Sequence, residues 1–360
     1  IFKPCLTFTA TSSSYFGIRY SESGFLFDNK GSSYFTDDRK LKSILGFLAS
    51  KPASNILKAI NPTIEFQPGN ISILPFMENI VDEDIVEIVD RIVDLSKTDW
   101  NAYEYSWDFK INPLIGKSVT SDKVSDVYAL LINQWSGMFL EMQVLEQKNN
   151  KNFIDLYGLS GEISPGVPLH EVTISCNPSY RYGGNKSRHE LEALQKADTI
   201  RDFISYSVGC MFGRYSVDKG GLILATQGNA LEDYLNLVPN PSFEPDYDNV
   251  VPLIDLELEK GKQDDWFEDD ISERFKAFLK VTFGTENYDE NLRFIEDAIG
   301  KDIKKFFLKD FYTDHIKRYK KRPIYWLFSS PKGSFNALIY MHRYRPDTVS
   351  VVLNDYLREF

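Results

Sequence analysis

Residues 176–180 (CNPSY) have side chains that could hold a DNA base. A loop of the form (D/N)-P-P-(Y/F) binds the amine of a flipped base through its oxygen acceptors, and its aromatic ring stacks on the base. Ser179 stands at the third position, and no glycine-rich cofactor loop precedes the stretch after a strand. We therefore predict no catalytic residue here, and a loop whose tyrosine packs on its domain explains the pattern.

The next residues, 180–188 (YRYGGNKSR), interleave aromatic and basic side chains around two glycines. Arg and Lys in such a loop suit contacts with phosphates, and the aromatic rings suit stacking. A solvated loop with its tyrosines turned inward is the alternative. The candidate contact residues are Arg181, Tyr182, Asn185, Lys186 and Arg188.

Residues 315–322 (HIKRYKKR) form the densest basic run of the chain. One interpretation is a patch that contacts the DNA backbone. The other is the cationic last turn of a helix, which the helix dipole favours. The candidate contact residues are Lys320, Lys321 and Arg322, with Arg214 as a further candidate in residues 203–215.

Three serines near the start of the chain could read bases, because short hydroxyl groups at a strand edge reach base edges or phosphates. An arginine that follows them could contact guanine. A plain polar turn is the alternative. The candidates in this region are Ser12, Ser13, Ser14, Tyr15, Arg19 and Lys30.

Other chemical patterns in the chain are weak. The four histidines are isolated and lack the spacing of metal ligands. Residues 116–118 end like a phosphate-binding loop but lack the glycine that should come five positions earlier. Residues 252–260 loosely resemble a metal nuclease, although Lys260 is misplaced for that motif. No metal site is predicted, and a metal nuclease stays only as a third option.

Composition limits the class of protein. The chain has 360 residues and a net charge of −11, which argues against a DNA binder that is basic over its whole surface. DNA binding would therefore need a basic groove on an acidic body. No apolar run is long enough for a membrane span and no signal peptide opens the chain. Three scattered cysteines suggest a reducing compartment, so we predict a cytoplasmic protein.

The elements that must position these residues are both helices and strands. Residues 1–40 alternate like a meander of short strands. Residues 41–60 have apolar residues at helical spacing that Pro52 interrupts, which predicts two short helices or one kinked helix. A tight turn at 67–70 and a short strand at 71–74 would close this region. The remaining predictions are helices over 80–95, 122–150, 189–217 and 268–318, strands at 172–174 and 324–328, a strand or the start of a helix at 335–340, and a loop over 228–262.

The predicted fold class is α+β. We expect a partial target-recognition domain at residues 1–76, a helical spacer at 77–160 and a C-terminal mixed α/β domain at 161–360. The chain opens with Ile1 inside an apparent strand and ends inside an apparent helix, so we also expect a fragment of a longer protein.

Several phrases of the sequence are similar to one family. Residues 41–76 (LKSILGFLASKPASNILKAINPTIEFQPGNISILPF) resemble the end of the target-recognition domain of bacterial DNA methyltransferases from restriction and phage-defence systems. Further phrases resemble the PglX family, the adenine-specific DNA methyltransferases of BREX phage-defence systems. They are FIDLYGL (153–159), YRYGG (180–184), FISYSVGCMFGRY (203–215), WFEDDI (266–271) and KKRPIYWLFSSPKGSF (320–335).

This resemblance implies a role in recognising double-stranded DNA. It implies that the parent protein binds S-adenosylmethionine in a methyltransferase domain, which this chain lacks together with its glycine-rich and N-P-P-Y motifs. We therefore expect no cofactor in this chain, and we expect the missing domain and other defence-system proteins as partners. The alternative function is a protein-interaction scaffold that docks other subunits of the defence system.

Overall fold

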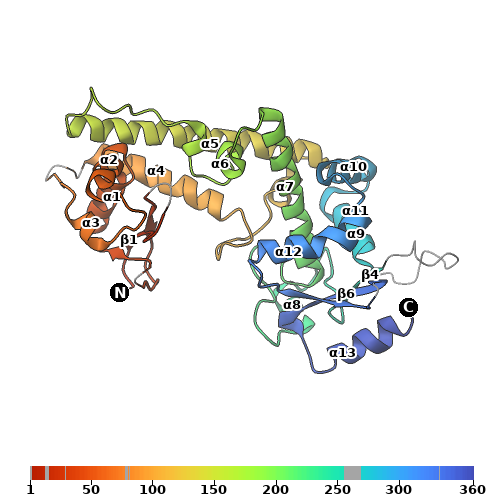
Figure 1. The fold of residues 1–360 in the computed structure, drawn as a ribbon. Coiled ribbons are helices and arrows are strands. Elements are labelled where there is room, and N and C mark those ends of the chain that lie inside the picture. The colour runs from red at the N-terminus through yellow and green to blue at the C-terminus, as the bar shows by residue number, and fades with distance from the viewer. Residues whose placement is uncertain are drawn as a thin grey trace. The chain divides into compact units, whose positions relative to one another are not determined.

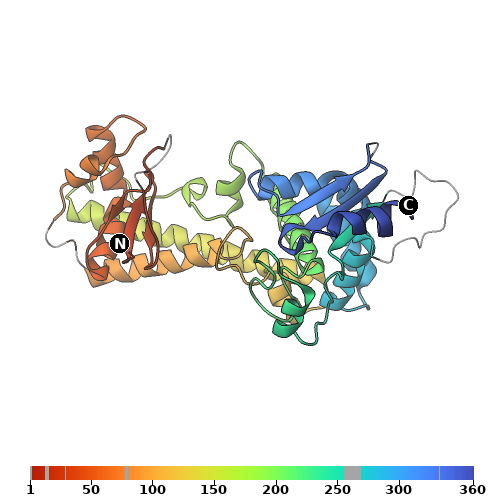
Figure 2. The same cartoon turned by 90° about the horizontal axis from the view of Figure 1, so that it is seen from below.

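The computed structural model describes residues 2–12, 16–28, 30–77, 80, 82–254, 269–331 and 333–360, without the side chains of 118 and 119. These residues form helices and two antiparallel three-stranded sheets, which confirms the α+β class (Figures 1 and 2). The chain divides into two compact units. Unit 1 comprises Ile1–Asp99 and Trp135–Gly183, and unit 2 comprises Trp100–Gln134 and Gly184–Phe360.

Unit 1 contains a small sheet, with β1 between its two neighbours, and several helices. The long helix α5 begins in unit 2 and continues into unit 1. The elements of unit 1 are β1 (Cys5–Phe8), β2 (Ile18–Ser21), β3 (Ser33–Tyr34), α1 (Asp38–Leu48), α2 (Lys51–Ile60), α3 (Pro68–Ser72), α4 (Glu83–Trp100), α5 (Val124–Leu156), a 3₁₀ turn (Leu169–Glu171) and α6 (Pro178–Tyr182).

The core of unit 1 lies between the sheet and the helices. Leu6 and Phe8 of β1 are buried against α1, α2 and α4, together with Phe153 of α5. Gly46 of α1 allows this close packing, because a Cβ there would lie 2.9 Å from Asn149 Oδ1 and 3.0 Å from Val89 Cγ2. The burial of leucine, isoleucine and phenylalanine side chains from several elements stabilises unit 1 through the hydrophobic effect.

Of the two alternatives predicted over 41–60, two short helices or one kinked helix, the structure shows two short helices. Pro52 lies in the first turn of α2, where a missing N–H costs little, rather than inside a helix. The strand predicted at 71–74 is wrong, because the chain forms α3 there. Pro68 favours a helix start, and Asn70 Oδ1 accepts a hydrogen bond from the Gln67 N–H at 2.9 Å, which fixes the first turn.

Unit 2 contains the second sheet, in which β6 lies between β4 and β5. Helix α12 and the C-terminal helical segment lie on opposite sides of this sheet (Figure 1). The elements of unit 2 are a 3₁₀ turn (Ile115–Thr120), α7 (Arg188–Met211), α8 (Leu231–Leu237), β4 (Val250–Ile254), α9 (Ile271–Phe283), α10 (Tyr288–Ile299), α11 (Ile303–Phe306), a π-helical turn (Phe307–Phe311), α12 (Tyr312–Arg318), β5 (Tyr325–Ser329), β6 (Phe335–Tyr340), a 3₁₀ turn (Met341–Arg343), α13 (Thr348–Val351) and a π-helical turn (Val352–Leu357).

Helix α7 forms the centre of unit 2, and all of its residues from Phe203 to Met211 are buried. Phe203 contacts Phe275, Phe278 and Phe283 of α9 with ring centroids 5.7 to 6.1 Å apart. Gly209 packs directly against an aromatic ring, since a Cβ there would lie 2.5 Å from Tyr215 Cδ2. The helix predicted over 189–217 is therefore confirmed, with a buried end that continues into a tightly packed turn.

The hairpin of β5 and β6 confirms the strand predicted at 324–328 and decides residues 335–340, predicted as a strand or a helix start, in favour of a strand. The loop predicted over 228–262 is wrong in part, since this region contains α8 and β4. Pro252 lies inside β4, opposite Ala337 of β6. A proline is tolerated because β4 is at the edge of the sheet and does not need every N–H.

The strand predicted at 172–174 is also wrong. A 3₁₀ turn precedes these residues, and the Ile174 N–H donates to Val172 O rather than to a neighbouring strand. The domain boundaries after residues 76 and 160 stay predictions. Among the described residues, no helix is long and apolar enough to cross a membrane. The three cysteines are free thiols and are all buried.

Candidate nucleic-acid interface

The outer face of the sheet in unit 1 carries polar side chains. Thr7 of β1 lies opposite Arg19 on one side and Ser33 on the other, and Leu6 and Phe8 face the core. Thr7 Oγ1 is 3.0 Å from Ser21 Oγ and 3.4 Å from Ser33 Oγ. We define the outer sheet face as Thr7, Arg19, Ser21 and Ser33. It presents short hydroxyl groups beside one exposed guanidinium, the side chains that suit base edges and phosphates.

Our sequence analysis singled out Arg19 but missed Thr7, Ser21 and Ser33. The sequence signal that could have found Thr7 is the alternation of apolar and polar side chains at Leu6, Thr7 and Phe8 of β1. The pairing register of the strands was needed to place Ser21 and Ser33 beside it.

The other candidates from this part of the sequence lie in turns. The Ser12 N–H donates to Ile64 O at 2.9 Å, while Ser13, Ser14 and Tyr15 lie outside the described residues. The Lys30 N–H donates to Asp28 Oδ1 at 2.8 Å, and the Lys30 side chain is exposed. Ser12 and Lys30 therefore have fixed backbones, and the exposed ammonium of Lys30 is accessible to an anion.

Residues 176–180 form the start of α6. Asn177 Oδ1 accepts from the Ser179 N–H at 3.1 Å, and its Nδ2 donates to Leu169 O at 2.8 Å and Val172 O at 3.0 Å. This buried amide caps α6 and holds the preceding chain, so its polar atoms face the protein. Burial raises the pKa of the Cys176 thiol, which keeps the sulfur protonated and unreactive.

Asp99 is a buried residue that our sequence analysis missed. Its carboxylate accepts from the Ser175 N–H at 2.6 Å and the Cys176 N–H at 2.8 Å. Burial raises the pKa of Asp99, and these two hydrogen bonds lower it in part. The contact anchors the segment before α6 to the end of α4, and therefore positions Arg181 and Tyr182 within unit 1.

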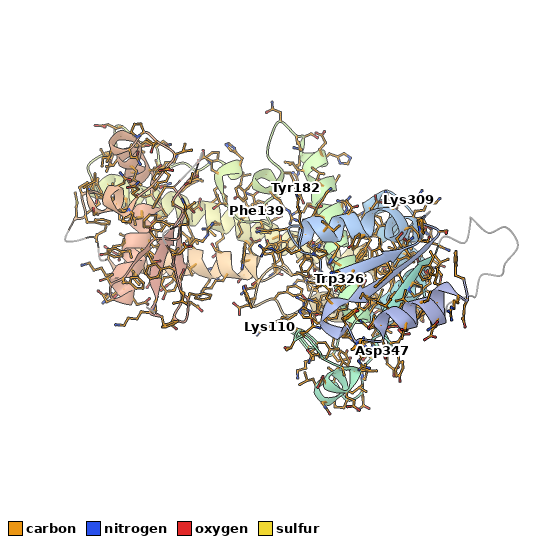
Figure 3. The ribbon with its side chains drawn as sticks, turned by 60° about the horizontal axis from the view of Figure 1, so that its bottom comes forward. Lys110, Phe139, Tyr182, Lys309, Trp326 and Asp347 are labelled. Atoms are coloured by element: carbon orange, nitrogen blue, oxygen red, sulfur yellow. The ribbon has the colours of Figure 1, made fainter. Side chains whose placement is uncertain are left out.

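Arg181 and Tyr182 lie at the end of α6, where the Arg181 guanidinium is 5.6 Å from the centre of the Tyr182 ring. Figure 3 labels Tyr182 at this end of unit 1. Gly183 and Gly184 then take positive φ values of 51° and 71°, which let the chain turn sharply after α6.

Asn185, Lys186 and Arg188 are exposed at the start of α7 in unit 2. Ser187 caps this helix together with Glu190, and Arg188 forms an ion pair with Glu192 at 2.7 Å. The Arg188 side chain is 92% exposed, so this pair is screened by water and an anion can compete for the guanidinium.

The basic run 315–322 divides into a buried half and an exposed half. His315 is buried, and its Nε2 accepts from the Ile324 N–H at 3.1 Å and the Tyr325 N–H at 3.2 Å. Burial, together with the nearby Arg318 and Arg214, lowers the pKa of His315 to about 3, so this imidazole is neutral. Arg318 is held by Asp202 of α7 and by Asp314, 3.0 Å away.

Residues 320–322, which we call the basic turn, follow α12 and are exposed. Among the described residues, no ion pair involves Lys320, Lys321 or Arg322. The helix-end interpretation is thus confirmed for residues 315–318, while the basic turn keeps three cations available for phosphates.

Arg214 supports the interior of unit 2. Its Nη1 donates to Tyr340 Oη at 3.0 Å and its Nε to Tyr215 Oη at 3.3 Å. These contacts link the turn after α7 to β6. Because two tyrosines hold a half-buried guanidinium, Arg214 is less accessible to a phosphate than the other candidates.

The basic candidates of unit 2 flank one helix rather than forming one patch. Arg318 contacts Asp202, which lies fourteen positions after Arg188 on α7. Fourteen residues of α-helix span about 21 Å. Arg188 and the place where Arg318 contacts α7 are therefore about 21 Å apart, which is about six phosphates of one B-DNA strand at about 3.4 Å each.

In the part of the chain that the structure describes, no three His, Cys, Asp or Glu side chains are grouped to hold a metal ion. The nuclease-like pattern falls largely on residues 255–268, outside the described residues. The described elements also do not fit a cofactor loop of the Rossmann type, since β3 leads into α1 through Phe35–Thr36–Asp37, which contains no glycine.

No protein-family model matches the chain. Over almost its whole length, however, the chain is similar to adenine-specific methyltransferases, which confirms the resemblance found in its sequence. It is 36% identical over 99% of its length to the adenine-specific methyltransferase PglX of Lacticaseibacillus casei (strain Zhang). It is 34% identical over 98% of its length to the adenine-specific methyltransferase BrxX of Escherichia coli O9:H4 (strain HS). The chain spans 28% and 29% of the length of these two relatives.

Proposed function

We propose that this chain binds double-stranded DNA and places a specific sequence before the methyltransferase domain of a longer parent protein. The similarity to two adenine-specific methyltransferases over 98–99% of the chain carries this proposal. In the parent, methyl transfer from S-adenosylmethionine to the exocyclic amine of a flipped adenine would follow. The protein would act in the cytoplasm as part of a BREX phage-defence system.

The described side chains suit two kinds of contact with a duplex, one with its phosphates and one with its base edges. Cations of Lys30, Arg181, Lys186, Arg188 and the basic turn would contact phosphates and set the register of the protein. The outer sheet face would contact base edges, because its hydroxyl groups and Arg19 are short-range donors and acceptors beside each other. Within each unit, these cations lie on turns, at helix ends or on the outer sheet face of an otherwise acidic chain, where they provide local positive charge.

Duplex binding by an Arg181→Ala, Arg188→Ala variant tests the proposal. Each lost phosphate contact reduces the slope of log affinity against log salt concentration by about 1, so we expect a reduction of about 2 and weaker binding at low salt. Fluorescence anisotropy with a labelled duplex between about 50 and 200 mM salt measures both. An Arg91→Ala, Arg293→Ala variant, which removes one exposed arginine from each unit, is the matched control.

A second candidate function is a scaffold that docks other defence-system proteins. The net charge of −11 favours it, because an acidic surface repels phosphates. If the unmodified chain does not bind a duplex even at low salt, the DNA-binding proposal is wrong and the scaffold function is favoured.

A further inference from the structure

The basic turn has an unusual backbone. Lys320 and Lys321 have φ values of 50° and 65°, in the left-handed region that favours glycine. The Lys321 N–H donates to Ile316 O at 2.8 Å and the Lys320 N–H to Lys317 O at 3.1 Å, which close the end of α12. A helix usually ends on glycine at such a position. Two successive lysines there are unfavourable for folding, and strained backbone of this kind is concentrated at functional sites.

An exposed aromatic side chain follows this turn closely in the chain, and a second exposed ring contacts the first. Trp326 is the second residue of β5 and comes four positions after Arg322, about 14 Å at most along extended chain. Its ring is 44% exposed, and the ring of Tyr344, 36% exposed, has its centroid 6.4 Å away. Figure 3 shows Trp326 on β5, well apart from Lys309 of the same unit.

The sheet register explains why Trp326 is exposed. It pairs with Ile339, so it lies on the sheet face that carries Val352 and Tyr356, whereas Tyr325 faces His315 on the side of α12. Among the described strands, β5 is at an edge of the sheet. The basic turn and Trp326 therefore lie on either side of one open strand edge, close to the start of β5.

Charge at this edge is complementary to a nucleic acid. Four cations near this edge are exposed: Lys320, Lys321, Arg322 and Arg345. The exposed acid that follows Arg345 in the sequence is Asp347. Aromatic rings that stack on bases next to cations that track the backbone form the usual site for single-stranded DNA. A fully paired duplex hides the faces of its bases, so exposed rings select nucleotides that are unpaired.

We propose that Trp326 and Tyr344 stack on unpaired nucleotides of a DNA strand whose phosphates contact the basic turn and Arg345. This inference rests on the proposed DNA-binding function and adds a specific ligand, an unpaired stretch next to a duplex. Such a stretch arises wherever a base is flipped out of a duplex or the strands separate locally.

Fluorescence anisotropy with three labelled probes tests the inference on the whole chain: a paired duplex, the same duplex with a central unpaired stretch of thymines, and a single strand of thymines. Trp326→Ala should weaken binding to the two unpaired probes fivefold or more, because one stacked base is lost. Binding to the paired duplex should change less than twofold. Trp326→Phe should keep most of the affinity for the unpaired probes. Trp107→Ala, at an exposed tryptophan of unit 2, should change the affinity neither for the unpaired probes nor for the paired duplex.

A Lys320→Gly, Lys321→Gly variant distinguishes an effect on DNA affinity from an effect on the stability of the fold. Glycine fits the positive φ values, so the melting temperature should stay the same or rise, while affinity for the unpaired probes should fall several-fold. Lys309→Ala controls for the loss of an exposed lysine elsewhere in unit 2. If Trp326→Ala does not fold, Tyr344→Ser provides the same comparison from the other ring.

The outcomes distinguish this inference from the proposed function. Equal affinity of the unmodified chain for paired and unpaired probes, unaffected by Trp326→Ala, would overturn the inference while leaving duplex recognition in place. Absence of binding to the paired duplex at low salt would overturn the proposed function, whether or not the chain binds the single strand of thymines.

Discussion

At the scale of single residues, burial and pairing decide which charged side chains of this protein are accessible to a ligand. Arg318 and Lys320 are two positions apart, yet Arg318 is held by two carboxylates and Lys320 is exposed. Glu104 shows the same effect for an acid, since burial raises the pKa of its carboxyl and Arg318 lowers it in part. The sequence identifies such residues as charged but does not reveal which of them water reaches.

Glu146 of α5 should make unit 1 less stable as the pH rises. Burial and, to a smaller extent, the nearby Glu171 together raise the pKa of this carboxyl to about 7. A raised pKa means that the protonated form is favoured in the folded state, so its stabilising contribution is full below pH 4.5 and is lost as the pH rises through 7. At about 1.4 kcal/mol per pKa unit, the loss amounts to at most about 3 kcal/mol.

Glu146→Gln should remove this dependence, because an amide imitates the protonated acid. We expect the variant to be more stable than the unmodified chain at pH 8 and nearly equal to it at pH 4.5, in urea unfolding followed by circular dichroism. Glu162→Gln, at an exposed position of the same unit, is the control. Equal stability of Glu146→Gln and the unmodified chain at both pH values would contradict the prediction.

At the scale of elements, α7 and α12 are joined by a buried ion cluster. Arg318 of α12 pairs with Asp202 of α7 and with Asp314, and its side chain is only 16% exposed. Breaking a buried pair leaves a carboxylate without compensation in a poorly solvated place. The cluster therefore fixes the end of α12 from which the basic turn emerges.

Arg318→Ala should destabilise unit 2 by about 3–5 kcal/mol, because Asp202 and Asp314 would lose their shared partner. The free energy of urea unfolding, extrapolated to water, measures this loss. Arg322→Ala, at the exposed end of the same basic run, should change it by about 0.5 kcal/mol or less. A loss below about 1 kcal/mol in Arg318→Ala would mean that water already reaches the cluster.

The long helices and the β5–β6 hairpin could be predicted from sequence, because their apolar periodicity extends over many residues. Short elements were harder, since local chemistry decided them. Pro68 and Asn70 turned an expected strand into α3, and the edge position of β4 allowed Pro252 where a loop was expected. The outer sheet face combines strands separated by up to 26 positions, so it needed the strand register.

At the scale of the whole molecule, the described sheets are small and antiparallel, unlike the parallel sheet that binds cofactors in Rossmann-type folds. We predict that the chain does not bind S-adenosylmethionine, because the connection from β3 to α1 contains no glycine and the described sheets are antiparallel. Isothermal titration calorimetry of the purified chain measures this directly. Micromolar binding would show that the chain contains a methyl-donor site and would revise its proposed role.

The burial of all three sulfhydryl groups has a practical consequence. Cys5, Cys176 and Cys210 are each no more than 6% exposed, so a maleimide dye or spin probe should react with them slowly under native conditions. A cysteine introduced at a surface position would then be tagged almost alone. One tag in each unit would let distance spectroscopy follow their separation as a duplex is added.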